Sequence, residues 1–128
     1  MKRTSVVTTN APGAIGPYSQ GIASGEMVFV SGQTPLRADG SMAPGGVAEH
    51  TAQCLNNIRE VLIGAGLTMN DVVKTTVFLT DLGQFGAMNE VYGKHFRPPF
   101  PARSTVQVCA LPKGADVEIE AVAVRPAA

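Results

Sequence analysis

Three charged residues near the end of the chain have the types that carboxylate binding and acid–base chemistry require. Arg103 follows Pro101-Ala102 at the start of one alternating run, whereas Glu118 and Glu120 lie in a second. An arginine offers two parallel N–H donors that fit a carboxylate. A partly desolvated glutamate can move a proton between water and a substrate. Surface charges at strand ends would give the same pattern, so alternation alone leaves both interpretations open.

Both runs have the period of two that is typical of half-buried strands. The first covers 102–110, the second covers 117–124, and a turn containing Pro112 and Gly114 separates them. In the second run, the two glutamates share one face with Val122 and Val124. We expect a face that combines carboxylates with valines to form an interface between subunits or the wall of a pocket.

The spacing of these residues restricts how the two strands can be arranged. In a simple hairpin, Arg103 would face Val124, and Glu118 would lie six residues further along, about 20 Å away at the rise of a strand. One small substrate cannot span that distance. The strands are therefore not adjacent, or one of the two groups comes from a neighbouring subunit.

Four further runs of β-branched or apolar residues predict the strands that surround this pair. They cover 4–9, 18–24, 27–32 and 71–80, and the last is the most β-branched run in the chain. Loops rich in proline and glycine separate them at 10–17 and 33–46. The first three strands are expected to form a meander or hairpin.

Two amphipathic stripes predict helices over about 47–65 and 82–96. The first ends before Gly66, a favoured residue just beyond a helix, and the second follows Asp81 and Gln84, which resemble a capping box. The predicted core stripes are Thr51, Leu55, Ile58, Leu62 and Ala65 in the first helix, and Phe85, Met88, Tyr92 and Phe96 in the second.

The resulting order, β-β-β-α-β-α-β-β, predicts an α+β fold with a mixed sheet and two helices on one face. We expect a single domain over residues 1–128. Two helices cover only one face of such a sheet. The simplest cover for the other face is a second copy of the chain, so the order also predicts an oligomer.

Composition excludes several classes of function. Charged residues make up 16% of the chain, a low share, and the formal net charge is zero without a basic block, so we expect no nucleic-acid partner. The first residues lack the long apolar run of a signal peptide, and no apolar run reaches membrane-spanning length, so we expect neither a signal peptide nor a membrane span. Cys54 and Cys109 fit buried thiols in a reducing compartment, so we expect a cytoplasmic protein without membrane contact.

Metal and phosphate chemistry also lack support in the sequence. His50 and His95 are too few and too far apart for a metal site, and each is interpreted as a solvated helix residue. The cysteines lack zinc-site spacing, and the glycine-containing loops lack a phosphate-binding fingerprint.

Several motifs together resemble the RidA family, also called the YjgF family. They are Gly16-Pro-Tyr-Ser-Gln, Ser31-Gly-Gln-Thr-Pro, Lys74-Thr-Thr-Val-Phe-Leu-Thr-Asp-Leu, Pro101-Ala-Arg-Ser, Leu111-Pro-Lys-Gly and Val117-Glu-Ile-Glu-Ala-Val-Ala-Val. The resemblance spans Asn10 to Val124. It implies a chorismate-mutase-like fold assembled as a homotrimer, with a site in each of three clefts between subunits and no cofactor.

The resemblance also implies roles for two charged residues. Arg103 matches the family arginine that binds the substrate carboxylate, and Glu118 matches a glutamate that positions or activates water. Glu120 shares the face of Glu118 and is its main rival.

Five further positions match residues that line the family cleft. Tyr18, Ser31 and Gly32 match its walls, and Asn89 matches a helix asparagine near its mouth. Thr105 occupies a substrate-binding position where many bacterial relatives carry cysteine, so thiol chemistry is absent there. We expect deamination to persist, because the family mechanism does not need a thiolate.

The function implied is hydrolysis of 2-aminoacrylate-type enamines and their 2-imino acid tautomers, such as 2-iminobutanoate and 2-iminopropanoate, which PLP enzymes release. The products are 2-oxo acids and ammonia. Two alternatives from other classes are an endoribonuclease-type translation inhibitor and a non-enzymatic small-molecule binder or stress chaperone.

Overall fold

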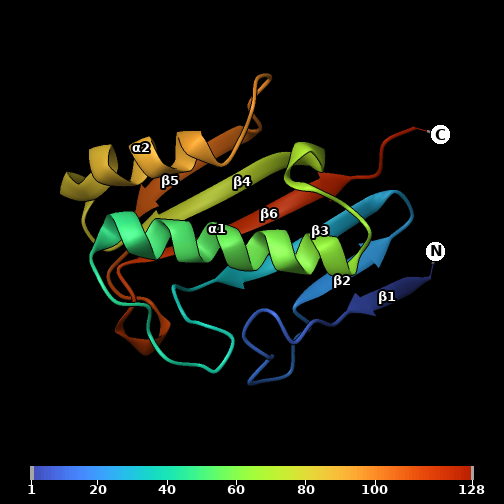
Figure 1. Ribbon diagram of the computed structural model, residues 1–128, viewed down its shortest axis with the longest axis horizontal. Helices are drawn as coiled ribbons and strands as arrows, with labels where there is room; N and C mark the ends of the chain where they lie inside the picture. The colour runs from blue at the N-terminus through green and yellow to red at the C-terminus, as the bar shows by residue number, and fades with distance from the viewer. Residues whose placement is uncertain (1, 128) are drawn as a thin grey trace.

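The computed structural model describes residues 2–127 and has the predicted order of strands and helices (Figure 1). Three short 3₁₀ turns accompany these elements. The strands are β1 (Arg3–Val6), β2 (Gly21–Ser24), β3 (Met27–Gln33), β4 (Val72–Leu79), β5 (Ala102–Gln107) and β6 (Val117–Val124), and the helices are α1 (Val47–Gly64) and α2 (Phe85–Lys94).

The six strands form one sheet in the order β1-β2-β3-β6-β4-β5. The first three strands are the expected antiparallel meander. The last strand of the chain lies between β3 and β4 and is antiparallel to both, whereas β4 and β5 are parallel and joined through α2. Strand β4 therefore separates β5 from β6, which confirms that the strands carrying Arg103 and Glu118 are not adjacent.

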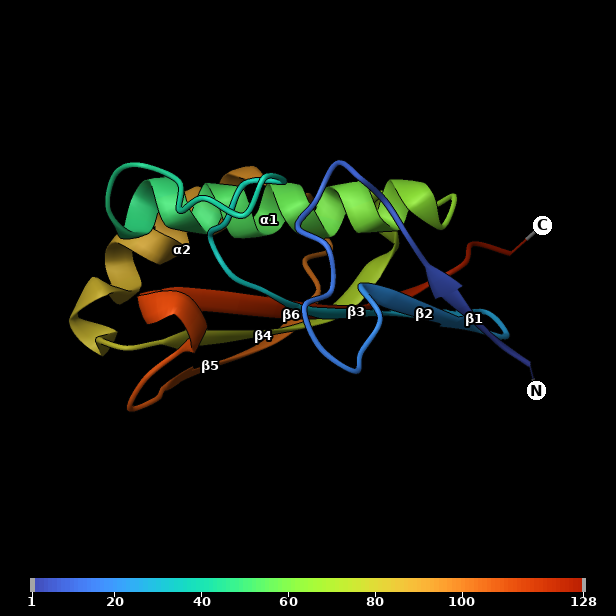
Figure 2. The same cartoon turned by 90° about the horizontal axis from the view of Figure 1, so that it is seen from below.

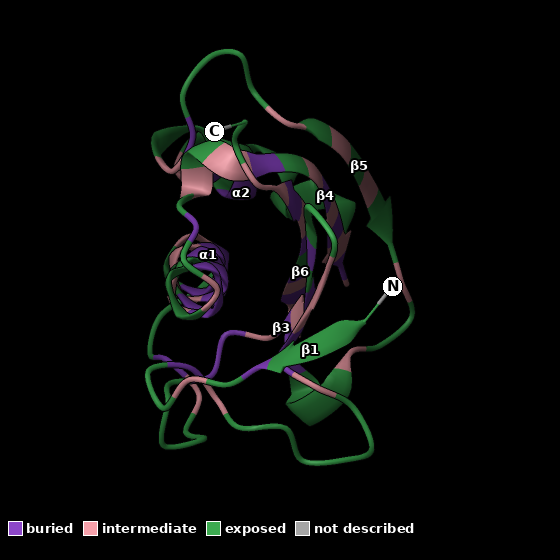
Figure 3. Cartoon of the chain, turned by 90° about the vertical axis from the view of Figure 1, so that its right-hand side faces the viewer, coloured by how far each residue is buried: buried purple, intermediate pink, exposed green. Residues whose placement is uncertain are grey.

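Both helices cover the same face of the sheet, as Figure 2 shows from the side. The core lies between α1 and the central strands, and the side of α1 that faces the sheet is coloured as buried in Figure 3. The opposite face stays open. Its partly exposed apolar side chains include Met27, Phe29 and Val106, and Phe29 is paired with Val122 of β6. The predicted one-sided cover is confirmed.

The first two strands are shorter than the predicted 4–9 and 18–24. The cause is Gln20, whose buried side chain bonds the backbone of the segment that was predicted to extend β1. Its amide donates to the carbonyls of Thr8 at 3.0 Å and Pro12 at 2.8 Å, and its Oε1 accepts from the Thr8 N–H at 2.9 Å. These groups are therefore satisfied in a loop rather than in a strand ladder.

The predicted second helix and the predicted strand at 102–110 also require corrections. Asp81 caps a separate 3₁₀ turn, Leu82–Gln84, by accepting from the Gly83 N–H at 2.8 Å, and α2 begins only at Phe85. The Phe85 side chain is 38% exposed, so its assignment to the core was wrong. Strand β5 ends at Gln107, which places Cys109 in the following loop, exposed rather than buried.

His50 is buried, contrary to the expected solvated position. Its Nδ1 lies 2.8 Å from Asp116 Oδ1, and its Nε2 lies 2.8 Å from the Ala43 carbonyl oxygen. Asn57, also on α1, donates to the carbonyl oxygens of Thr34 and Leu36. Two buried polar side chains of α1 therefore fix both stems of the loop at 34–46.

None of the helices in the described part of the chain is both long and apolar enough to cross a membrane.

Candidate active site

An open cleft of about 750 Å³ lies where the end of β3 and the start of β6 meet three loop segments. It brings together four predicted site residues, Tyr18, Ser31, Gly32 and Glu118, and their rival Glu120. The loop at 12–15, the tip of the loop at 34–46 and Lys113 complete its walls. These segments are far apart in the sequence, and the central position of β6 is what joins them.

Glu118 lies directly over Gly32. The register of β3 and β6 shifts between Val30 and Gln33, so Gly32 sits at an irregularity opposite the glutamate. A Cβ atom at position 32 would lie 2.9 Å from the Cδ atom of Glu118, closer than real Cβ contacts. Glycine therefore leaves the space that the Glu118 carboxylate occupies, and a larger residue would displace that carboxylate.

Among the carboxylates that line the cleft, Glu118 has the raised pKa that is common at functional sites. Burial of its side chain, followed by the nearby negative charge of Glu120, raises the pKa of Glu118 above the ordinary glutamate value. Glu120 is the more exposed of the two. A half-buried carboxylate with a raised pKa in a cleft has the properties of a general base.

The Ser31 side chain does not point freely into the cleft. Ser31 is bonded instead to the segment at 18–20, which forms the adjacent wall. Its hydroxyl donates to the Ser19 carbonyl oxygen at 2.5 Å, and its backbone N–H donates to the Gln20 carbonyl oxygen at 3.0 Å. The adjacent Tyr18 is 51% exposed, and its hydroxyl oxygen accepts from the Ile15 N–H at 3.3 Å. No pattern in the sequence indicates the supporting role of Gln20.

The remaining predicted residues form a second cluster beside α2. Arg103 Nη1 donates to Asn89 Oδ1 at 2.8 Å, the only hydrogen bond of this guanidinium within residues 2–127. Its carbon Cζ lies 4.7 Å from the ring centre of Tyr92 and 5.5 Å from that of Phe85. The neighbouring Thr105 hydroxyl is buried and has no hydrogen-bond partner among the described residues.

The two clusters lie on opposite faces of the sheet. Arg103 pairs with Thr75 of β4, and Glu118 pairs with Phe78 of the same strand. These partners are three positions apart, an odd separation, so their side chains point to opposite faces. Thr75 is buried under α2, where its hydroxyl meets Tyr92. Arg103 is therefore on the helix-covered face, and one chain does not bring it to Glu118.

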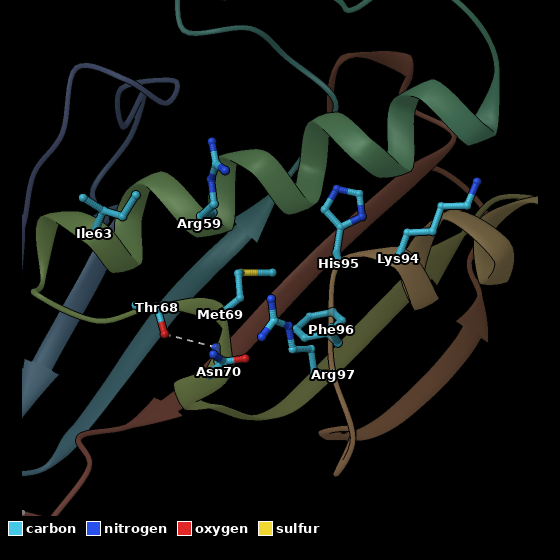
Figure 4. Close-up of a pocket in the computed structure, with 9 residues that line it drawn as sticks. All are labelled: Arg59, Ile63, Thr68, Met69, Asn70, Lys94, His95, Phe96 and Arg97. Atoms are coloured by element: carbon cyan, nitrogen blue, oxygen red, sulfur yellow. Dashed lines mark hydrogen bonds between the residues drawn. The ribbon is translucent and has the colours of Figure 1, made fainter.

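A second hollow, of about 360 Å³, lies on the helix side and contains none of the predicted residues (Figure 4). Arg59, Lys94 and Arg97 line it, and no acidic residue does so in the described part of the chain. Figure 4 shows Arg97 beside Asn70, whereas Arg59 and Lys94 extend outward from the rim. The fold brings together three basic residues that are far apart in the sequence, but among the described residues no buried polar group lines the hollow.

The sheet, its two helices and the carboxylate-lined cleft define the class of the protein, a small α+β domain with an open cleft. The family described as Endoribonuclease L-PSP matches residues 8–125. The chain belongs to this family, which includes the RidA and YjgF proteins, and the resemblance seen in its motifs is confirmed.

Relatives over nearly the full length carry the name 2-iminobutanoate/2-iminopropanoate deaminase. The mouse protein is 48% identical over 124 residues, covering 96% of this chain and 92% of its own. The human protein is 47% identical, with 96% and 90% coverage. Two Escherichia coli crystal structures, TdcF with bound serine and the YjgF gene product, are each 44% identical with a TM-score of 0.90, covering 96% of this chain and 99% of theirs.

Proposed function

We propose that this protein is a cytoplasmic deaminase that hydrolyses 2-imino acids and their enamine tautomers to 2-oxo acids and ammonia. The observation that carries the proposal is the half-buried Glu118, whose pKa is raised in a cleft that contains the predicted wall residues. The mouse and human relatives, both named for this activity on 2-iminobutanoate and 2-iminopropanoate, supply the substrate class. TdcF with bound serine shows that a structural relative accepts a small amino acid.

The proposed reaction needs one base and one carboxylate anchor. Arg103 binds the substrate carboxylate, and Glu118 removes a proton from water as its oxygen attacks the imine carbon. The same glutamate then delivers that proton to the nitrogen. With the imine entering in its protonated form, the C–N bond breaks as Glu118 takes the proton of the new hydroxyl group; ammonia leaves, and the carbonyl of the 2-oxo acid forms. An enamine enters the same route after it is protonated on carbon to give the imine.

The proposed active form is a homotrimer of chorismate-mutase-like subunits with its sites between subunits. Two observations support an assembly. Arg103 and Glu118 point to opposite faces of one chain, and the open face carries exposed apolar side chains that need cover. In such a site, one subunit contributes Glu118, Tyr18 and Gly32, and its neighbour contributes Arg103. The buried hydroxyl of Thr105, without a partner within residues 2–127, then lies beside the substrate carboxylate.

The test is a coupled assay in which a PLP-dependent threonine dehydratase generates the enamine in solution. The rate of 2-oxobutanoate release is measured with and without this protein. Acceleration that is lost in Arg103→Ala, with the oligomeric state preserved, supports both the reaction and its anchor. No acceleration by an assembled wild-type protein would contradict the proposal.

The family description also names an endoribonuclease, which is the alternative activity to test. Purified wild-type protein and Glu118→Gln are incubated with single-stranded RNA under the same conditions. RNA cleavage that disappears in the variant, without any deamination by the wild type, would replace the deaminase assignment.

A further inference from the structure

The Arg103 guanidinium is held by more contacts within its own chain than the binding of a carboxylate alone requires. Phe85, Asn89 and Tyr92 contact it and occupy positions i, i+4 and i+7 of α2, which lie on one face of a helix. Seven residues of helix span about 10.5 Å. The Cζ atom of Arg103 lies 5.5 Å from the Phe85 ring centre and 4.7 Å from that of Tyr92, so the guanidinium is in reach of both rings.

This arrangement leaves one direction for a ligand. A guanidinium has five N–H donors in a single plane, and only one of them is bonded within residues 2–127, to Asn89. The aromatic rings lie against the cation and hold its orientation through cation–π attraction. A carboxylate that approaches in the plane then meets two parallel donors already aligned for a bidentate pair.

The two rings are supported in different ways. Tyr92 is buried, and its hydroxyl lies 2.7 Å from Thr75 Oγ1, so it belongs to the core as well as to the guanidinium. Burial raises the pKa of Tyr92, so its hydroxyl stays protonated. Phe85 is at the first turn of α2 with 38% of its surface exposed, so its ring lies at the surface, where it contacts the guanidinium.

We propose that Phe85 is a positioning residue, which together with Tyr92 holds the Arg103 guanidinium in the orientation that binds the substrate carboxylate bidentately. This inference rests on the proposed deaminase function. It assigns to Phe85 a role in substrate affinity rather than in the core, and to the Tyr92 hydroxyl a role in stability rather than in affinity.

The experiment compares Phe85→Leu with Phe85→Trp and with Tyr92→Phe. With 2-iminobutanoate as the substrate, each variant is assayed for kcat, for KM and for competitive inhibition by 2-oxobutanoate, a stable ligand with the same carboxylate. Loss of the Phe85 ring is expected to raise both KM and the inhibition constant about two- to five-fold, the range of one exposed cation–π contact, with kcat unchanged. Tryptophan, the strongest cation–π partner, is expected to restore both values.

Thermal unfolding separates this role from a structural one. Phe85→Leu is expected to keep the wild-type Tm. Tyr92→Phe is expected to lower the Tm, because it leaves the buried Thr75 hydroxyl without its partner. The same variant should keep the wild-type KM, because the aromatic ring is preserved. Leu82→Ala, which removes another exposed apolar side chain near α2, is the control and should change neither. An unchanged inhibition constant in Phe85→Leu, or no rescue by tryptophan, overturns the inference. An inactive wild-type protein would instead overturn the proposed function.

Discussion

The cleft cluster around Glu118 and the edge cluster around Arg103 hold their charged groups by different means. Glu118 is placed by the backbone, because β6 is paired on both sides and Gly32 leaves room for its carboxylate. Arg103 lies on β5, an edge strand paired on one side only, and side chains of α2 hold it. The proposed base is therefore fixed by the sheet, and the proposed carboxylate anchor is fixed by side-chain contacts that single substitutions can remove.

This difference predicts how each cluster fails. Changes near Glu118 alter the position or the charge of the base, so they should lower kcat. Changes near Arg103 weaken the binding of the substrate carboxylate. Because this contact is expected to be equally strong in the ground state and in the transition state, such changes should raise KM.

The largest expected loss of activity comes from removing Arg103 or Glu118, and mixing the two variants tests whether these residues meet between subunits. Arg103→Ala and Glu118→Gln should each lose activity by about 10³-fold, because the anchor or the base is missing. When equal amounts of the two variants are unfolded together and refolded, the proposed trimer should regain about a quarter of wild-type activity, because about one cleft in four combines an intact Arg103 with an intact Glu118. Activity is measured after mixing, and refolding each variant alone is the control. No recovery from a properly assembled mixture would mean that one chain supplies both groups.

Gly32→Ala should have the next largest effect. The new Cβ would displace the Glu118 carboxylate and is expected to lower kcat about ten- to hundred-fold, while KM changes little. Gly13 lines the same cleft, and a Cβ there would meet nothing within 4 Å, so Gly13→Ala is the matched control. Steady-state kinetics of both variants check this, and equal kcat values would show that the placement of Glu118 is not limiting.

Asn89→Asp tests the edge cluster with a residue of the same shape. An ionised aspartate would pair with Arg103 Nη1 and partly neutralise it, so it competes with the substrate carboxylate. We expect KM to rise about ten-fold in Asn89→Asp and less in Asn89→Ala, which removes the contact without adding charge. Initial rates over a range of substrate concentrations distinguish the two, and a larger defect in the alanine variant would contradict the model.

The dependence of kcat/KM on pH should distinguish the two glutamates. Because the Glu120 charge helps to raise the pKa of Glu118, Glu120→Gln should lower that pKa. The base must be ionised to act, so the acid limb of kcat/KM should move to lower pH in this variant while the plateau persists. Loss of the plateau itself would assign the base to Glu120.

Stability should show the smallest effect. A carboxyl group whose pKa is raised by folding costs stability when it is ionised, and this cost disappears as pH falls through the folded-state pKa. Glu118→Gln should therefore raise the free energy of unfolding at pH 8 by less than about 1 kcal/mol, a small gain because the side chain is half exposed. The gain should vanish in acid, as measured by chemical denaturation at several pH values. Equal stability at all pH values would show that burial does not strain this carboxylate.

Much of the fold could be predicted from the sequence because period-two and helical stripes reflect burial directly. The alternation of residues 117–124 indicated the correct faces of β6, and the β-branched run indicated β4. The sequence pattern alone could not predict that the side chains of Arg103 and Glu118 point to opposite faces of the sheet. Their directions depend on two separate registers, that of β5 against β4 and that of β6 against β4. Phe85 and His50 were misassigned because their environments come from partners far along the chain, Arg103 and Asp116.

The loop at 34–46 has a consequence for how this protein could acquire new substrates. His50 and Asn57 fix its two stems to α1, and its tip, with Ala38, Asp39 and Gly40, forms one wall of the cleft. Because both stems are fixed, a change of residue at the tip alters one wall of the cleft and leaves the attachment of the loop to α1 intact. Diversification within the family can then proceed by point changes in a short exposed segment, without disturbing the base or the core.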